Sequence, residues 1–214
     1  MSAPHNDFLD GLAQELKPKP KWLRPISVGL IWWLASWAFV FGAILTRAPL
    51  RPGFDGQLLE SLRLALEIAI GLGLGAAGIS TALQLAVPDP TPLGQRLVIP
   101  VVLLASWLGL LAYGLSDPAL APSMLGKREG CWIEALLYGL PPLALGLALL
   151  RRLAPLSRAP VGALLGLTAG SLPGILMQLA CMYDPWHALT HHVGPMIPLA
   201  LIGAVLGPRI LRRI

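Results

Sequence analysis

Residues 161–181 read VGALLGLTAGSLPGILMQLAC and contain no charged side chain. A helix that rises about 1.5 Å per residue needs about 20 apolar residues to cross the hydrocarbon core of a bilayer, and this stretch has that length. Its glycines recur at every fourth position, as Gly162, Gly166, Gly170 and Gly174, and therefore lie on one face of a helix. Such a face of small residues predicts close helix packing inside a membrane.

The chain has five further apolar runs of similar character. The six runs lie roughly at residues 26–46, 58–86, 97–116, 132–150, 161–181 and 193–208. Because a bilayer offers the backbone no hydrogen-bond partner, runs this uniformly apolar are expected to be helices and not barrel strands. We predict an all-α polytopic membrane protein, with a six-transmembrane-helix bundle in residues 26–214. Residues 1–25 are predicted to form a short cytoplasmic amphipathic helix and a basic linker.

The composition excludes a soluble globular domain. Of the 214 residues, 55% are hydrophobic and only 13% are charged, and the mean hydropathy is +0.69. The net charge of +5 does not indicate direct nucleic-acid binding, because the basic residues are segregated by membrane side.

Basic residues are concentrated on one side of the predicted spans. That side carries Lys17, Lys19, Lys21, Arg24, Arg96, Arg151, Arg152, Arg158, Arg209, Arg212 and Arg213, and the other carries Arg47, Arg51, Lys127 and Arg128. The positive-inside rule then predicts that both termini are cytoplasmic, and no cleavable signal is evident. In a bacterium this places the chain in the inner membrane, with residues 47–57, 117–131 and 182–192 facing the oxidising exterior.

The segment before the first span has a different character. It reads HNDFLDGLAQELKPKPKWLRP, and Phe8, Leu9, Leu12 and Leu16 recur at helical spacing to form one apolar stripe. Its polar face is acidic and includes Asp10, whereas a helix that binds an anionic leaflet would be basic. We interpret residues 6–16 as a helix that binds a basic protein partner, with a frayed terminus as the alternative.

Three charged residues near the second span fall on one predicted helical face. Glu60, Arg63 and Glu67 are spaced by three and four residues, so they can form ion pairs while facing inward. Glu67 is the deepest of them, and a carboxylate inside a membrane is a functional candidate. A structural ion-pair triad is the alternative explanation.

The two cysteines of the chain are predicted to lie together at the outer rim. Cys131 opens the fourth span and Cys181 closes the fifth, and consecutive spans run antiparallel. Cys181 comes seven residues after Gly174, so at about 100° per residue it points within about 20° of the glycine face, into the bundle. Candidate neighbours of the thiols are Glu134, Asp184, His187, His191 and His192.

This grouping allows more than one chemistry. Thiols near imidazoles and carboxylates can bind a soft metal ion transiently, with Cys131 and Cys181 as ligands, or can form a disulfide under oxidation. They can also be small buried hydrophobic residues with no further role. We expect no required cofactor.

The order of these features resembles the NrsF-type membrane anti-sigma factors, the negative regulators of sigma F. A D-hydrophobic-hydrophobic-x-x-L-A-x-x-L segment precedes six spans, a cysteine opens the fourth and another closes the fifth. A tryptophan–histidine element, Trp186 to His192, precedes the sixth. The resemblance implies a non-enzymatic regulator of an extracytoplasmic-function sigma factor.

In that family the cytoplasmic N-terminus holds the sigma factor, and two outward cysteines are implicated in its release under heavy-metal or oxidative stress. These roles would fall on the 6–16 helix and on Cys131 and Cys181. This sequence doubles the histidine element, so it does not decide which imidazole matters.

Two other classes of function compete with this one. A small transporter or ion channel would use the intramembrane carboxylates and kinked spans, but we find no inverted repeat between the two halves. A membrane thiol oxidoreductase would use both cysteines, but the chain has no C-x-x-C pair.

Overall fold

The computed structural model describes residues 25–87, 91–153, 155 and 157–212. Its elements are α2 (Pro25–Arg47), α3 (Phe54–Glu60), α4 (Leu62–Leu85), α5 (Leu93–Tyr113), α6 (Cys131–Arg151), α7 (Arg158–Ala180), α8 (Pro185–His187), the π-helix η1 (Ala188–Val193) and α9 (Met196–Ile210). Six helical stretches are long and apolar enough to cross a membrane, the sixth being the continuous segment from α8 to α9. The predicted all-α fold with six spans is confirmed. The predicted helix at residues 6–16 lies outside the described residues.

The second span begins later than the hydropathy pattern indicates. Ser61 has an extended backbone (φ −105°, ψ 96°), and its Oγ accepts a hydrogen bond from the Leu64 backbone N–H at 3.2 Å. This side-chain cap starts α4 at Leu62 and separates it from the short helix α3.

The prediction that three charged residues share one helical face is therefore wrong for Glu60. Glu60 ends α3 and is exposed, so it does not share a helix with the other two residues. Arg63 and Glu67 do form an ion pair at 3.5 Å, and Arg63 also pairs with Asp117 of the connection that follows α5. Glu67 is buried, as expected for a charged face that points into the bundle.

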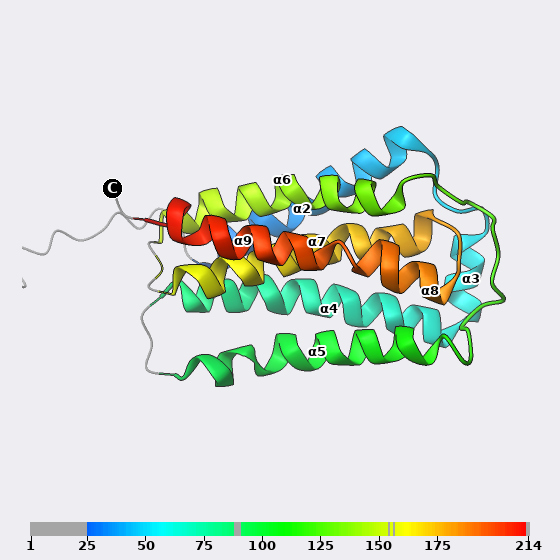
Figure 1. Ribbon diagram of the computed structural model, residues 1–214, viewed down its shortest axis with the longest axis horizontal. Helices are drawn as coiled ribbons and strands as arrows, with labels where there is room; N and C mark the ends of the chain where they lie inside the picture. Colours follow the sequence, from blue (N-terminus) through cyan, green and yellow to red (C-terminus); the bar gives the residue numbers. More distant parts are fainter. Residues whose placement is uncertain (1–24, 88–90, 154, 156, 213–214) are drawn as a thin grey trace, which may run out of the picture.

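Helix α7 occupies the centre of the bundle. It packs against α9, α4 and α6, whereas α5 lies at the edge, on the far side of α4 (Figure 1). Among the described spans, α7 is the most enclosed by protein. This explains why its sequence is apolar on every face, since a helix surrounded by other helices has no amphipathic stripe.

The glycine face of α7 packs directly against the backbone of α9. A Cβ at Gly162 would collide with the backbone carbonyl of Gly203, and one at Gly166 would collide with the carbonyl of Leu199. Only glycine at these positions allows the two backbones to approach this closely. The predicted packing role of this face is confirmed, and Gly203 and Gly207 of α9 complete the contact.

The second and fifth spans also contact each other, through a different face of α7. Gly71 of α4 lies against Ile175, and Gly78 lies against Thr168. The glycines of α4 thus receive side chains of α7, while the glycines of α7 receive the backbone of α9. Glycines at both contacts, on α4 in the first and on α7 and α9 in the second, allow α7 to be enclosed by its neighbours.

Substitution of Gly166 by alanine should destabilise the bundle, because the added methyl group meets a backbone carbonyl that cannot rotate away. We expect a loss of about 1–3 kcal/mol, measured as a lower midpoint of thermal unfolding in detergent. Gly109→Ala is the matched control, since no heavy atom lies within 4 Å of its Cβ position. A Gly166→Ala protein as stable as this control would contradict the packing.

Candidate functional site: a buried cluster of thiols and imidazoles

The two cysteines meet at the end of the bundle opposite the last residues of α9, where α6 begins and α7 ends (Figure 1). Gly130 precedes α6 with a left-handed backbone (φ 82°), which turns the chain directly into Cys131. The two Sγ atoms are 2.9 Å apart, and both thiols are free. Cys131 is 1% exposed and Cys181 is 0% exposed, so solvent reaches neither thiol directly.

Two imidazoles complete the cluster. The Nε2 atom of His187 lies 3.5 Å from Sγ of Cys181. Ligand atoms of Cys131, Cys181, His187 and His192 all lie within 4.8 Å of one another. His192 is fully buried, and neither of its ring nitrogens makes a well-formed hydrogen bond within the described part of the chain.

The π-helix η1 is what brings these two histidines together. In an α-helix, residues five apart point about 140° away from each other. In η1 the backbone bonds span five residues, as in the bond from Gly194 N–H to the Leu189 carbonyl at 3.0 Å. His187 and His192 therefore point to the same side, with ring centroids 5.0 Å apart. Single π-helical turns of this kind occur frequently at functional sites.

The other candidate neighbours lie around the cluster and contribute no ligand atom to it. Asp184 caps α8 by accepting a hydrogen bond from the His187 backbone N–H at 2.7 Å, and this bond fixes the backbone position of His187. The exposed His191 stacks on His187 with a centroid distance of 4.3 Å. Glu134 pairs with Arg47 and Arg128, each at 3.5 Å.

Two buried arginines fix the backbone on either side of Cys181. Arg128 donates to the carbonyl of Ala180 at 3.2 Å, and Arg51 donates to the carbonyl of Cys181 at 2.8 Å. Arg128 also donates to the carbonyls of Ala48 and Pro49, which follow α2. Sequence reasoning counted both arginines only as charges that determine topology. Their position on the side with few basic residues was the feature that could have singled them out.

The electrostatic environment favours a thiolate at Cys181. The hydrogen bond from the Cys131 thiol lowers the pKa of Cys181 below its usual range, and contact with His187 adds to this against the opposing effect of burial. A thiolate is the reactive form of cysteine, both as a nucleophile and as a metal ligand. The cluster is therefore arranged for thiol chemistry.

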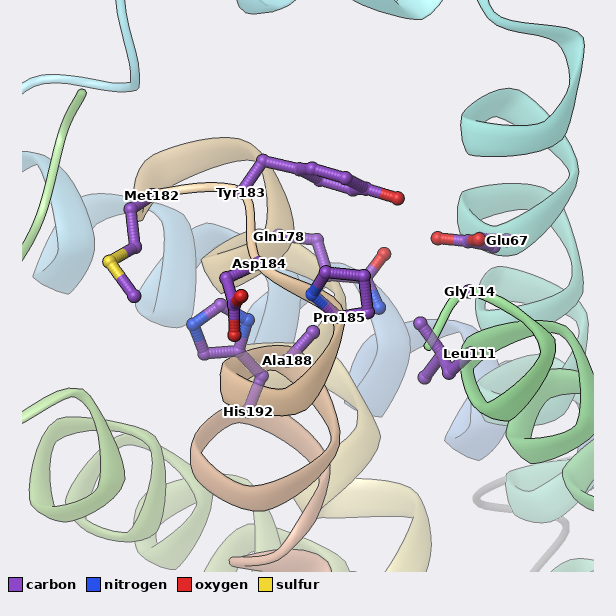
Figure 2. Close-up of a pocket in the computed structure, with 10 residues that line it drawn as sticks. All are labelled: Glu67, Leu111, Gly114, Gln178, Met182, Tyr183, Asp184, Pro185, Ala188 and His192. Carbon is purple, nitrogen blue, oxygen red and sulfur yellow. The ribbon is translucent and has the colours of Figure 1, made fainter. Parts of the chain in front are cut away.

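A small cavity adjoins the cluster on the side of α4 and α5. Figure 2 shows Glu67 at one end of it and His192 and Asp184 at the other, with the Tyr183 ring pointing toward Glu67. Both amide atoms of Gln178, which also lines the cavity, lack a hydrogen-bond partner among the described residues. The cavity volume of about 10 Å³ is enough for about one water molecule, and too small for a transported solute.

These features define the class to which the protein belongs. It is a polytopic helical membrane protein with a cluster of two thiols and two imidazoles at one end of its bundle. Comparison with protein families matches residues 12–212 to NrsF, described as "Negative regulator of sigma F". The chain therefore belongs to the NrsF family, and the family name indicates a sigma factor as the regulated partner. Regulators of this kind are not typically enzymes. No curated protein and no solved structure matched the chain.

Mild oxidation should join the two cysteines within one chain. Diamide would take up the two thiol hydrogens, and the sulfur atoms need to approach by only about 0.9 Å to reach the bond length of a disulfide. Mass spectrometry after unfolding and alkylation should show two alkyl groups on the reduced protein and none on the oxidised one. Cys131→Ser should retain one alkylated thiol after the same treatment. Two alkylated cysteines in the oxidised wild-type protein would contradict the observed proximity.

Proposed function

We propose that this protein is a membrane-bound anti-sigma factor of the bacterial inner membrane. It sequesters an extracytoplasmic-function sigma factor through its cytoplasmic N-terminal segment, and it releases that factor when heavy metals or oxidants act on Cys131 and Cys181. The observation that carries the proposal is the NrsF match over residues 12–212, which extends from the N-terminal segment to the end of the bundle.

The distribution of charge supports the orientation that this function requires. Both termini are cytoplasmic on the basis of the eleven basic residues on their side of the membrane against four on the other. The thiol cluster then faces the exterior and the sigma factor lies inside, so that the bundle separates the sensor from its output. The lipid bilayer holds the inhibitor, and with it the bound sigma factor, away from the chromosome.

The composition of the N-terminal segment supports a sigma factor as the ligand. Sigma factors bind DNA with basic surfaces, which complement the acidic face that includes Asp10. The stripe of Phe8, Leu9, Leu12 and Leu16 would fill an apolar groove on that partner. A segment of about 12 residues forms little helix alone in water, so it would become ordered on binding.

The central position of α7 supports transmission of the stimulus through the bundle. Cys181 directly follows α7, which contacts α9, α4, α6 and α2. A new bond at Cys181 would therefore displace the end of α7, which contacts most of the other described helices. Packed helices have few alternative arrangements, so a small displacement at one end biases a switch between two states of the bundle.

Substitution of Leu12 by aspartate should abolish sequestration. The new charge would enter an apolar groove, at a cost of several kcal/mol if it is buried and unpaired. The sigma-dependent genes should then be active without stress, and the detergent-solubilised protein should no longer pull down the sigma factor. Gln14→Asp is the matched control, because it adds the same charge outside the apolar stripe. Full repression by a Leu12→Asp protein that accumulates in the membrane would disprove the role of this segment.

Replacement of both cysteines by serine should remove the response to stress. Serine preserves the size of the side chain but forms neither a disulfide nor a stable bond to a soft metal. The double variant should still bind the sigma factor and should respond weakly or not at all to cadmium, chromate or peroxide. Release without stress would mean that the reduced thiols maintain the inhibited state. A normal response would leave the cysteines with a packing role only.

A further inference from the structure

We infer that Cys131, Cys181, His187 and His192 form a closed four-ligand site for one soft divalent cation of the Zn²⁺ or Cd²⁺ type. The inference identifies the ligand of the thiol cluster, and it rests on the proposed function for the consequence of binding. Four ligand atoms from separate parts of the chain, α6, the residue after α7, α8 and η1, converge within 4.8 Å of one another. Two sulfur and two nitrogen ligands are a common donor set for tetrahedral zinc.

The distance between Cys181 Sγ and His187 Nε2 matches that of a tetrahedral site, whereas the two sulfur atoms lie closer together than such a site requires. With metal–sulfur bonds of about 2.3 Å and metal–nitrogen bonds of about 2.05 Å, a sulfur and a nitrogen ligand lie about 3.6 Å apart, and two sulfur ligands lie about 3.8 Å apart. The observed separation of Cys181 Sγ and His187 Nε2 is 3.5 Å, and that of the two Sγ atoms is 2.9 Å. A metal ion therefore needs the thiols to separate by about 0.9 Å, whereas a disulfide needs the opposite movement.

His192 provides an independent indication of a ligand. Its side chain is 0% exposed, and neither ring nitrogen makes a well-formed hydrogen bond among the residues that the structure describes, where the Cys181 thiol is only a weak partner of the ring. A buried imidazole in an ordinary core is hydrogen-bonded, since a polar group removed from water without a partner destabilises the fold. Coordination would satisfy one nitrogen of His192. Asp184 and Gln178 line the adjoining cavity together with His192 (Figure 2).

Charge balance selects the class of cation. Both cysteines must be deprotonated to bind a metal, so the site supplies two thiolates and two neutral imidazoles. A divalent ion then gives a complex with no net charge, which suits a buried site at the rim of a membrane. A monovalent ion would leave one uncompensated negative charge. Thiolate and imidazole ligands favour Zn²⁺ and Cd²⁺ over Mg²⁺ and Ca²⁺, which prefer oxygen ligands.

The burial pattern indicates how the ion enters. Cys131, Cys181 and His192 are buried, and only His187 of the four is partly exposed. An ion from the exterior would contact His187 first and then pass to the thiols behind it. His191 stacks on the same ring but is exposed and contributes no ligand atom to the cluster, so it provides a matched control.

The test uses the full-length reduced protein in lipid nanodiscs, titrated with Cd²⁺, Zn²⁺ or Mg²⁺. We expect one Cd²⁺ or Zn²⁺ ion per chain and no binding of Mg²⁺. Competition between Zn²⁺ and Cd²⁺ then determines which ion the site prefers. Cys181→Ser should abolish binding, and His192→Ala should weaken it by more than about 100-fold, since even loss of a residue that only supports a ligand costs 10–100-fold. His191→Ala should bind as the wild type does.

X-ray absorption spectroscopy of the zinc-loaded wild-type protein tests the ligand set without any substitution. The inference requires two sulfur neighbours at about 2.3 Å and two nitrogen neighbours at about 2.0–2.1 Å. Absence of binding, or a coordination shell without two nitrogens, would overturn the site.

Parallel measurement of sigma factor release separates the two proposals. Metal binding without release would refute the metal trigger and keep the site, whereas cysteine-dependent release by peroxide without metal binding would refute the site and keep the proposed function.

Discussion

The contact between the backbones of α7 and α9 determines where the functional groups lie. Because Gly162, Gly166 and Gly203 have no side chains, the two helices approach until carbonyl groups touch α-carbons. The same glycine face continues to Gly174, where a Cβ would lie 3.0 Å from the carbonyl of His192. Cys181 follows two turns later on that face. A side chain anywhere along this contact would separate the two helices and move the imidazoles away from the thiols.

Two buried arginines join the chain segments at the end of the bundle that holds the thiols. Arg51 and Arg128 are both buried, and they donate to carbonyl groups that follow α2 and end α7. A guanidinium group has five donors in a rigid plane, so one side chain can join several chain segments. These bonds hold Cys181 in place from both sides. The thiols, which lie between the ends of two helices, therefore keep a defined geometry.

Several parts of this arrangement follow from sequence patterns that are local. Hydropathy identified six spans, and the spacing of four residues identified the glycine face. Antiparallel spans placed Cys131 and Cys181 at one end, where the structure brings them together. The starts of two spans were predicted incorrectly, because local hydrogen bonding and not hydropathy determines where these helices begin. Ser61 caps α4 through its own hydroxyl, so that Glu60 lies outside the span, and the last span begins at Pro185 instead of near residue 193. Hydropathy does not register either a cap or a π-helical turn.

The sequence by itself determined the class of fold, the number of spans and the end of the bundle that holds the thiols, because hydrophobic length and helical periodicity are properties of neighbouring residues. The choice of His187 and His192 over His191 was decided by the tertiary structure. An α-helical projection separates the first two by about 140°, and only the π-helical turn of η1 aligns them. That turn, the buried arginines and the buried ring of His192 depend on contacts between residues far apart in the chain, which no local pattern records.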